Sequence, residues 1–347
     1  MSRIVFATDL HLTEGHGGQD AFAMDLREIA ALAPDLLVLG GDVCLWESGA
    51  GDHLQDLLGT LPFKVMHLMG NHDTDRLGSA ATFDRDFTSR FGARNDHIEL
   101  GDTHVITLNT CRLQPEYDDW RNVRAEVCAD DLIWLETTLA GLTPDLPLLV
   151  FVHIPLATTY PERRKADRAT TDVWRVTNAD VVLEQFSSWS GPVVIGQGHL
   201  HENEHLHRDG MHLVSVGSVC GRWWQQGKQT RCTDNSPRGW LIAEAGGGLV
   251  DLAYRAAQAP PTWQGEIVMI DGSLWLNLFF GDPAETVEIC WDTEWVALPA
   301  PGSVAVDDTF FSVHHWPLPP DCAADTIEVR TRMRGLPRAV GVVHRLR

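Results

Sequence analysis

Five short polar segments in the first 202 residues carry side chains that can bind metal ions or move protons. Each follows an apolar run that predicts a β-strand. In an α/β sheet, the loops at the carboxyl ends of the strands gather at one edge, so residues far apart in the sequence can share a cleft. The segments are Asp9-Leu10-His11, Gly41-Asp42, Gly70-Asn71-His72-Asp73, His153 and Gly198-His199-Leu200-His201.

The residue types in these segments indicate a metal centre. Two aspartates, one asparagine and five histidines are candidate ligands, and borderline divalent metals favour this mixture of imidazole nitrogen and carboxylate or amide oxygen. Eight groups are too many for a single ion. Seven suit two ions that share one bridging carboxylate, which leaves one histidine for chemistry. A helix cap, a turn or a structural histidine would explain each segment alone, but their joint occurrence at strand ends favours the metal centre.

The apolar pattern of the first half predicts the elements that position these segments. Short apolar runs without alternation, joined by amphipathic stretches, are typical of strands that are covered on both faces by helices or by another sheet. The predicted strands are residues 3–8, 35–41, 64–70, 104–110, 148–154 and 193–198, and the predicted helices are 20–32, 53–61 and 130–142.

The pattern changes after about residue 205. Asp-Gly at 209–210 and a glycine turn within 238–255 predict two hairpins. The segment 257–262 reads as a linker, and the alternating runs that follow it predict a small β-sandwich with five of the 13 tryptophans. We therefore expect a catalytic domain at 1–258 and an all-β domain at 259–347.

The five segments resemble the motifs of the calcineurin-like metallophosphoesterases: D-x-H, G-D, G-N-H-[D/E], H and G-H-x-H. The match covers about residues 1–202, and no motif position is substituted. The resemblance implies an α/β fold, namely a double β-sheet sandwich flanked by helices. It also implies a phosphoric ester hydrolase with two metal ions (manganese, iron or zinc), in which a hydroxide that bridges the ions attacks phosphorus.

The same resemblance implies a role for each motif residue. One set would bind the first ion, a second set would bind the second ion, and Asp42 would bridge them. His72 would be a catalytic proton donor or charge stabiliser beside the leaving-group oxygen, and Asp73 would orient it. The first set is Asp9, His11 and His201, and the second is Asn71, His153 and His199.

Residues 217–224 and 234–240 resemble the G-S-x-x-G-x-W-W and D-G-x-P-x-G-[YW] motifs of a subgroup with an added C-terminal β-domain. Asn235 stands where that pattern has glycine. Within these motifs, Arg222 is a candidate phosphate contact, and Trp223 and Trp224 are candidate stacking platforms, although a core role would also explain both tryptophans. His16 lies in a glycine-rich stretch and is a further candidate for contact with substrate, at the entrance of the binding cleft.

The composition narrows the choice of partners. Lys+Arg is 27 and Asp+Glu is 48, which gives a formal net charge of −21. This charge disfavours nucleic acid and anionic membranes, but a small anionic phosphate ester remains compatible because local metal ions can reverse the field. The seven widely spaced cysteines favour reduced thiols, and with no signal peptide or membrane span evident, we expect a cytoplasmic protein.

Three functions stay open at this point. Hydrolysis of a small-molecule phosphomonoester is favoured, because the basic segment 160–175 could close over an anionic substrate. The alternative is a phosphodiesterase for cyclic nucleotides or glycerophosphodiesters. The third is a binding function, in which the β-domain binds glycan or protein and the enzyme activity is secondary. A phosphoprotein phosphatase is less favoured. The sequence leaves the metal pair and the oligomeric state open.

Overall fold

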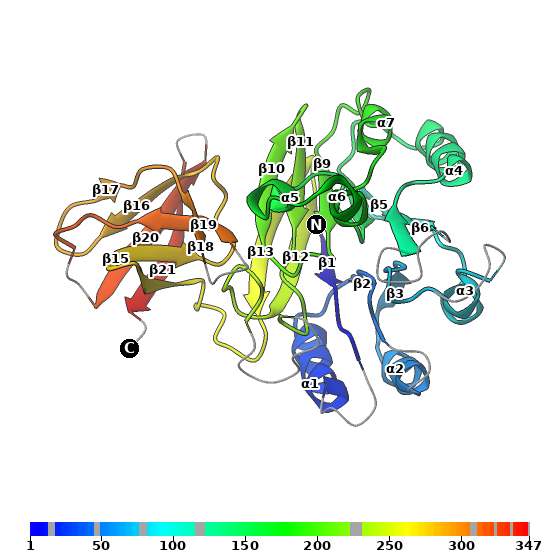
Figure 1. Ribbon diagram of the computed structural model, residues 1–347, viewed down its shortest axis with the longest axis horizontal. Helices are drawn as coiled ribbons and strands as arrows, with labels where there is room; N and C mark the ends of the chain where they lie inside the picture. Colours follow the sequence, from blue (N-terminus) through cyan, green and yellow to red (C-terminus); the bar gives the residue numbers. More distant parts are fainter. Residues whose placement is uncertain are drawn as a thin grey trace.

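The computed structural model describes residues 1–12, 18–44, 49–75, 82–114, 122–222, 231–305, 311–322, 325–333 and 336–345. Its first part contains two sheets that face each other (Figure 1). In the described part of the chain, no helix is long and apolar enough to cross a bilayer. None of the seven cysteines, all of which are described, forms a disulfide.

The first sheet has the order β13-β12-β1-β2-β3, and the second has the order β10-β11-β9-β8-β5-β4. In the first sheet β1, β2 and β3 are parallel, and β12 joins β1 in the antiparallel direction. The strands of the first sheet are β1 (Ser2–Ala7), β2 (Leu36–Leu39), β3 (Lys64–His67), β12 (Gly239–Gly246) and β13 (Leu249–Ala256). Those of the second are β4 (Asp96–Leu100), β5 (Thr103–Leu108), β8 (Leu148–Val152), β9 (Val193–Gln197), β10 (Glu204–Arg208) and β11 (Met211–Ser215).

Apolar side chains from both sheets form the central core. Phe6 of β1 stacks on Phe151 of β8, with ring centroids 4.7 Å apart. Helices α1 (Gly18–Ala31) and α2 (Ala50–Leu58) pack on the first sheet, and α4 (Ala129–Ala140) and α7 (Ala179–Glu184) pack on the second. Strands are therefore covered on both faces, which explains their unbroken apolar runs and confirms the predicted α/β fold class. The remaining elements of this part are α3 (Arg85–Phe91), β6 (Cys111–Leu113), β7 (Val123–Ala125), α5 (Tyr160–Arg163) and α6 (Arg168–Trp174).

The C-terminal part is rich in strands, as predicted. Its strands form one continuous sheet of eight, in the order β17-β16-β20-β21-β14-β15-β19-β18, which curls around its own core that includes Ile289 and Trp316. A single curled sheet thus takes the place of the two layers of a sandwich. The strands are β14 (Gly265–Ile270), β15 (Ser273–Leu278), β16 (Thr286–Cys290), β17 (Val296–Ala297), β18 (Gly302–Ala305), β19 (Phe311–Pro317), β20 (Thr326–Met333) and β21 (Leu336–Arg345).

The C-terminal part packs against the two-sheet core. Phe279 is fully buried and belongs to the same apolar cluster as the facing sides of the two sheets. Arg231 donates two hydrogen bonds to Glu266, at 2.6 and 3.0 Å. Trp240 does not belong to this contact and lies in the core beneath α1. The C-terminal part therefore contacts the two-sheet core through Phe279, and the boundary at 258/259 stays a prediction.

Removal of residues 259–347 is expected to lower the melting temperature of the remaining fragment or to cause its aggregation. The truncation deletes Phe279 and uncovers the apolar surface against which it packs. Differential scanning fluorimetry and light scattering on the 1–258 fragment measure both effects. A monodisperse fragment with wild-type stability and kinetics would contradict the packing argument.

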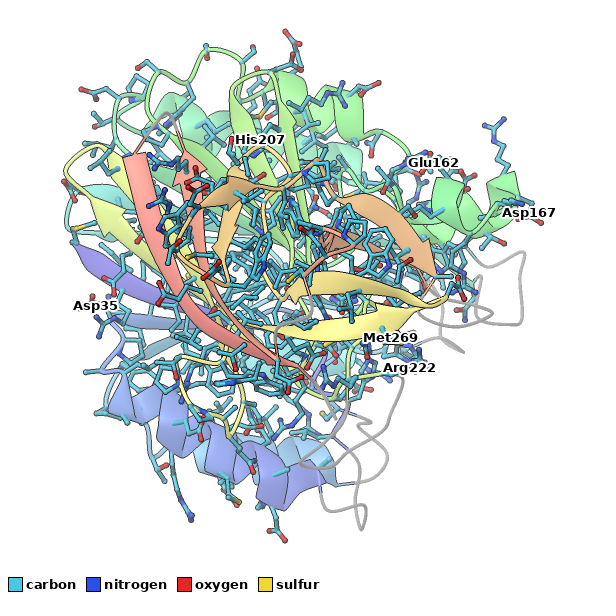
Figure 2. The ribbon with its side chains drawn as sticks, turned by 90° about the vertical axis from the view of Figure 1, so that its left-hand side faces the viewer. Asp35, Glu162, Asp167, His207, Arg222 and Met269 are labelled. Atoms are coloured by element: carbon cyan, nitrogen blue, oxygen red, sulfur yellow. The ribbon has the colours of Figure 1, made fainter. Side chains whose placement is uncertain are left out.

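Point variants of the full chain test the same contact without truncation. Phe279→Ala is expected to lower the free energy of unfolding by about 3–5 kcal/mol, as for other buried phenylalanines. Met269→Ala is the control, because Met269 is 59% exposed on β14 (Figure 2) and its removal should cost less than about 0.5 kcal/mol.

Candidate metal centre

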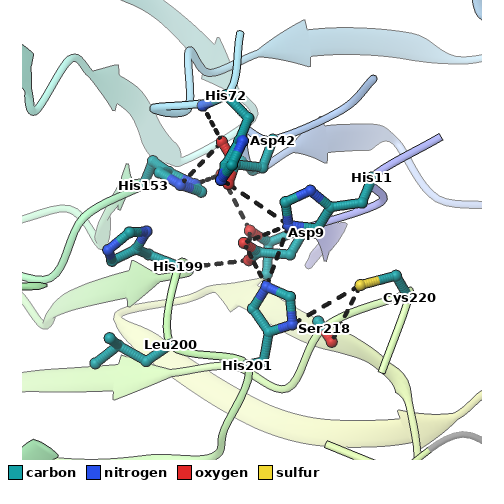
Figure 3. A network of polar contacts seen from close by, with 12 residues as sticks. Asp9, His11, Asp42, His72, His153, His199, Leu200, His201, Ser218 and Cys220 are labelled. Atoms are coloured by element: carbon teal, nitrogen blue, oxygen red, sulfur yellow. Dashed lines mark hydrogen bonds and ion pairs between the residues drawn. The ribbon is translucent and has the colours of Figure 1, made fainter. Parts of the chain in front are cut away.

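The structure brings the five sequence segments together where the strands of both sheets end (Figure 3). Asp9 follows β1, Asp42 follows β2, His153 follows β8, and His199 follows β9. Backbone hydrogen bonds join neighbouring loops: the N–H of Asp9 donates to the Gly41 carbonyl at 3.0 Å, and other bonds join the remaining loops in the same way. The loops that carry these side chains are therefore held together by backbone hydrogen bonds.

Five of the seven predicted ligand residues adopt the left-handed backbone conformation. Such residues cost about 1–3 kcal/mol each and persist where the surrounding structure dictates them. The φ angles are 56° for Asp9, 47° for His11, 51° for Asp42, 73° for His199 and 54° for His201. The sharp turns that result direct side chains from separate loops toward a common point.

Two motif glycines allow the loops to approach closely. A Cβ atom on Gly70 would lie 2.2 Å from the backbone nitrogen and from Oδ1 of Asp42. A Cβ atom on Gly198 would lie 2.2 Å from Oγ1 of Thr8. Real Cβ atoms do not tolerate these distances, so the glycines of the G-N-H-D and G-H-x-H segments are steric requirements of the site.

The side chains gather in two groups around Asp42. In the first, Nε2 of His201 lies 3.2 Å from both Oδ1 of Asp9 and Nε2 of His11. In the second, Nε2 of His153 lies 3.1 Å from Oδ1 of Asn71, and His199 lies close enough to share an ion with His153 and Asp42.

Asp42 lies between the two groups and faces each with a different oxygen. Its Oδ2 is 3.5 Å from Nε2 of His11, and its Oδ1 is 3.4 Å from Nε2 of His153. This arrangement is the one expected of a carboxylate that bridges two ions.

Backbone carbonyls fix the orientation of the histidine rings. The Nδ1–H groups of His153 and His201 donate to the carbonyls of Gly40 and Gly221, at 2.8 and 2.6 Å, which turns each Nε2 toward the other side chains of the centre. His199 uses Nε2 to donate to Val173 at 3.0 Å, so its Nδ1 is the available nitrogen.

One buried oxygen supplies the clearest test of whether ions fit this site. Oδ2 of Asp9 accepts hydrogen bonds from Thr8 Oγ1 at 2.6 Å and from the His199 N–H at 2.9 Å. Oδ1 of Asp9 is buried, accepts no hydrogen bond from the described residues, and faces His201. A cation at this oxygen would compensate its desolvation, so the site fits metal ions.

Burial and mutual charge shift the pKa values of these groups in the metal-free protein. Burial lowers the pKa of His11 and of His199 to about 3, so both rings are neutral. Burial opposes ionisation of Asp42, but the neighbouring histidines, His153 foremost, hold the pKa of this carboxyl well below its usual range. Burial lowers the pKa of His153, but Asp42 outweighs it and raises the value to about 9. His11 and His199 are therefore already in the neutral form that metal binding requires, whereas His153 must lose a proton when an ion binds.

His72 lies at the open side of the centre. Its side chain is 26% exposed, whereas that of Asp42 is only 2% exposed, and its Nε2 is 3.9 Å from Oδ2 of Asp42. The backbone N–H of His72 donates to Oδ1 of Asp42 at 2.7 Å. His72 can therefore meet a ligand that enters from solvent.

Asp73 holds the loops together. Its carboxylate accepts three backbone hydrogen bonds, from Asp42 at 2.7 Å, Val43 at 2.9 Å and Gly70 at 2.8 Å. These contacts fix the Asp42 loop against the Gly70 loop. The predicted orientation of His72 by Asp73 stays a prediction.

The structure describes only one of the four residues that are predicted to contact substrate. His16, Trp223 and Trp224 lie outside the described residues. Arg222 follows Gly221, the partner of His201, and its backbone N–H donates to the Arg231 carbonyl at 2.7 Å. A phosphate contact by Arg222 stays a prediction.

The sequence analysis assigned no individual role to Cys220, but the structure places it at the centre. Its Sγ lies 3.8 Å from Nδ1 of His201, and it is close enough to His11 and His201 to share an ion with them. Its position inside the G-S-x-x-G segment was the available signal.

Comparison with known proteins agrees with this geometry. The model of the calcineurin-like phosphoesterase family matches residues 2–203, and the chain belongs to this family. It is therefore a metal-dependent phosphoric ester hydrolase.

Two relatives extend the comparison. A probable cyclic nucleotide phosphodiesterase from Rhodopseudomonas palustris is 28% identical over 211 residues, which cover 57% of this chain and 71% of that protein. A dimetal phosphatase from Danio rerio has a similar structure, with a TM-score of 0.55 and 12% identity over 74% of this chain and 96% of that chain. At this identity the second likeness shows the fold alone.

Proposed function

We propose that the chain hydrolyses a small phosphodiester at a centre of two metal ions. The observation that carries this proposal is the convergence of six buried or half-buried donor groups around Asp42, with the more exposed His72 beside them. One ion would be held by Asp9, His11 and His201, the other by Asn71, His153 and His199, and Asp42 would contact both.

The bound ions would supply an activated water and offset the charge on the phosphoryl oxygens. The donor set of imidazole nitrogens with carboxylate and amide oxygens suits manganese, iron or zinc. The chain's own residues hold this arrangement in place: carbonyl partners orient His153 and His201, and Thr8 anchors Asp9. Ligands fixed in this way require little reorganisation when the substrate binds.

His72 would donate a proton to the leaving group. Its imidazole lies at the open side of the centre, and its backbone is fixed through Asp42. A protonated ring there can donate to the departing alkoxide oxygen, and the same charge stabilises that oxygen in the transition state.

The structure removes one residue of the basic segment 160–175 from the argument that favoured a phosphomonoester. Arg163 of the basic segment is nearly buried, and it hydrogen-bonds Glu202 and lies 3.7 Å from Glu204. Its charge is therefore offset within the fold and is not offered to a substrate as part of a lid.

A polar cavity that is lined in part by α6 supports the diester. The cavity has a volume of about 510 Å³ and is lined by Asp172 of α6. The carbonyl of the next residue of α6, Val173, accepts a hydrogen bond from His199 of the metal centre. The second substituent of a diester needs room and a contact beyond the ions, and this cavity could provide both. The 28% identical relative, named for cyclic nucleotides, points in the same direction. Four arginines line the cavity: Arg112, Arg124, Arg168 and Arg175.

A substrate panel tests the proposal. We expect the Mn²⁺-loaded enzyme to cleave bis(p-nitrophenyl) phosphate with a kcat/KM at least about tenfold above that for p-nitrophenyl phosphate, a difference of about 1.4 kcal/mol in transition-state stabilisation. Cyclic AMP and glycerophosphocholine extend the panel to natural diesters. The Asp42→Asn protein, prepared in parallel, shows whether the activity belongs to this site. A preference for the monoester would overturn the diester assignment and favour the phosphatase.

A further inference from the structure

A second group of metal-binding side chains lies outside the catalytic centre, on the hairpin of β10 and β11. His205 and His207 are two residues apart on β10, so they share one face of the strand. His212 of β11 pairs with His207 across the hairpin and therefore lies on the same face. The sequence analysis left these histidines without a role.

The C-terminal part supplies a carboxylate to this face. Asp282 follows β15, and its Oδ2 lies 2.8 Å from Nε2 of His207 and 3.8 Å from Nε2 of His212. Nδ1 of His205 lies 2.9 Å from Nε2 of His212. Three nitrogens and one oxygen thus come together from segments 70 residues apart in the sequence.

The spacing of these atoms suits one tetrahedral ion. Zinc binds nitrogen at about 2.0–2.1 Å, which places neighbouring ligand atoms about 3.3 Å apart. The three distances above, 2.8, 2.9 and 3.8 Å, lie on either side of this value. His205, His212 and Asp282 are already close enough to share an ion, and the partly exposed His207, which hydrogen-bonds Asp282, would complete the set after its side chain turns toward them.

The environment of the cluster also suits an ion. Burial lowers the pKa of His205 to about 3 and that of His212 to about 4, so both rings are neutral and offer lone pairs. Asp282 is 5% exposed, and its Oδ1 accepts the Ala284 N–H at 2.8 Å, which orients Oδ2 toward the histidines. His207 is 43% exposed and gives an ion a path from solvent.

We propose that His205, His207, His212 and Asp282 bind one structural divalent ion, with zinc favoured. Four protein ligands close the coordination sphere, which is typical of structural zinc sites and leaves no position for a substrate. The ion ties the β10–β11 hairpin of the phosphoesterase part to the C-terminal part. The site shares no residue with the catalytic centre, and its test does not depend on the reaction.

Metal analysis of the full-length protein tests this proposal. After equilibration with Zn²⁺ and gel filtration, the wild type should hold one ion more per chain than the His207→Ala and Asp282→Asn variants. His97→Ala is the matched control, because His97 also contacts a histidine across a hairpin, with Nε2 3.4 Å from Nδ1 of His104. This control should keep the wild-type count.

Two further readouts separate a bound ion from a network of hydrogen bonds. Co²⁺ at a tetrahedral site gives intense visible absorption, and this absorption should fall in both cluster variants while phosphoesterase activity remains. Zn²⁺ should raise the melting temperature of the wild type more than that of either variant. Equal zinc counts in the wild type and both variants would overturn the proposal and leave the cluster as a hydrogen-bonded interface.

Discussion

The Asp42→Ala and Asp42→Asn proteins are expected to lose bound metal and to hydrolyse phosphate esters at least about 10³-fold more slowly than the wild type. Asp42 is the carboxylate that faces both groups of ligands, with one oxygen 3.5 Å from His11 and the other 3.4 Å from His153. Its loss removes a ligand from each ion. Since two-metal sites contribute several kcal/mol to the transition state, the effect on kcat/KM should be large.

The asparagine variant separates ligation from backbone effects. Asp42 has a φ of 51°, a conformation that asparagine tolerates better than alanine. Asp42→Asn should therefore keep the loop and lose the charge. Plasma mass spectrometry gives the metal content, initial rates give kcat/KM, and exposed Asp56→Ala is the control. An Asp42→Asn protein with two ions and wild-type turnover would refute the bridging role.

The second large effect is expected at His72. His72→Ala should keep its metal ions and lose about 10²–10⁴-fold in kcat for a substrate with a poor leaving group. Nε2 of His72 lies 3.9 Å from Oδ2 of Asp42, and the His72 side chain is 26% exposed, whereas the predicted ligands are buried or half-buried. The loss should therefore appear in the chemical step and not in metal content.

Leaving-group dependence distinguishes proton donation from other roles of His72. A p-nitrophenolate leaves without a proton, so the variant should lose much less activity on the p-nitrophenyl diester than on an alkyl diester. His97→Ala, remote from the centre in sequence and on β4, should behave like the wild type on both substrates. Equal losses on both would show that His72 does not act as a general acid.

The sequence was sufficient to predict which side chains gather at this edge of the sheets, because each segment follows a predicted strand. The apolar run before Asp9 or His153 defines the strand end, and the parallel arrangement brings those ends together. One departure from the subgroup pattern also has a physical explanation. Asn235 has a φ of 68°, and asparagine is one of the few residues besides glycine that adopt this conformation readily.

Contacts between distant segments could not be predicted in this way. The meeting of Asp282 with His207 depends on how the C-terminal sheet docks, and no local pattern encodes that docking. Phe279 ends a predicted strand like many other aromatic residues, and only the folded chain shows that it completes the central core. Arg163 likewise looked like part of a basic lid until its pairing with Glu202 was visible.

The pairing of β1 with β12 has a consequence for how the chain folds during its synthesis. Ser2 lies opposite Ala245, so one of the two partner strands of β1 is synthesised more than 240 residues after β1 itself. Pairing over such a distance slows folding, because loop-closure entropy is lost before the contact forms. Phe279, which completes the central core, is synthesised later still. We therefore expect the loops of Asp9 and His11 to reach their final geometry only after β12 and Phe279 have been synthesised, and the apolar face of β1 to depend on chaperones until then.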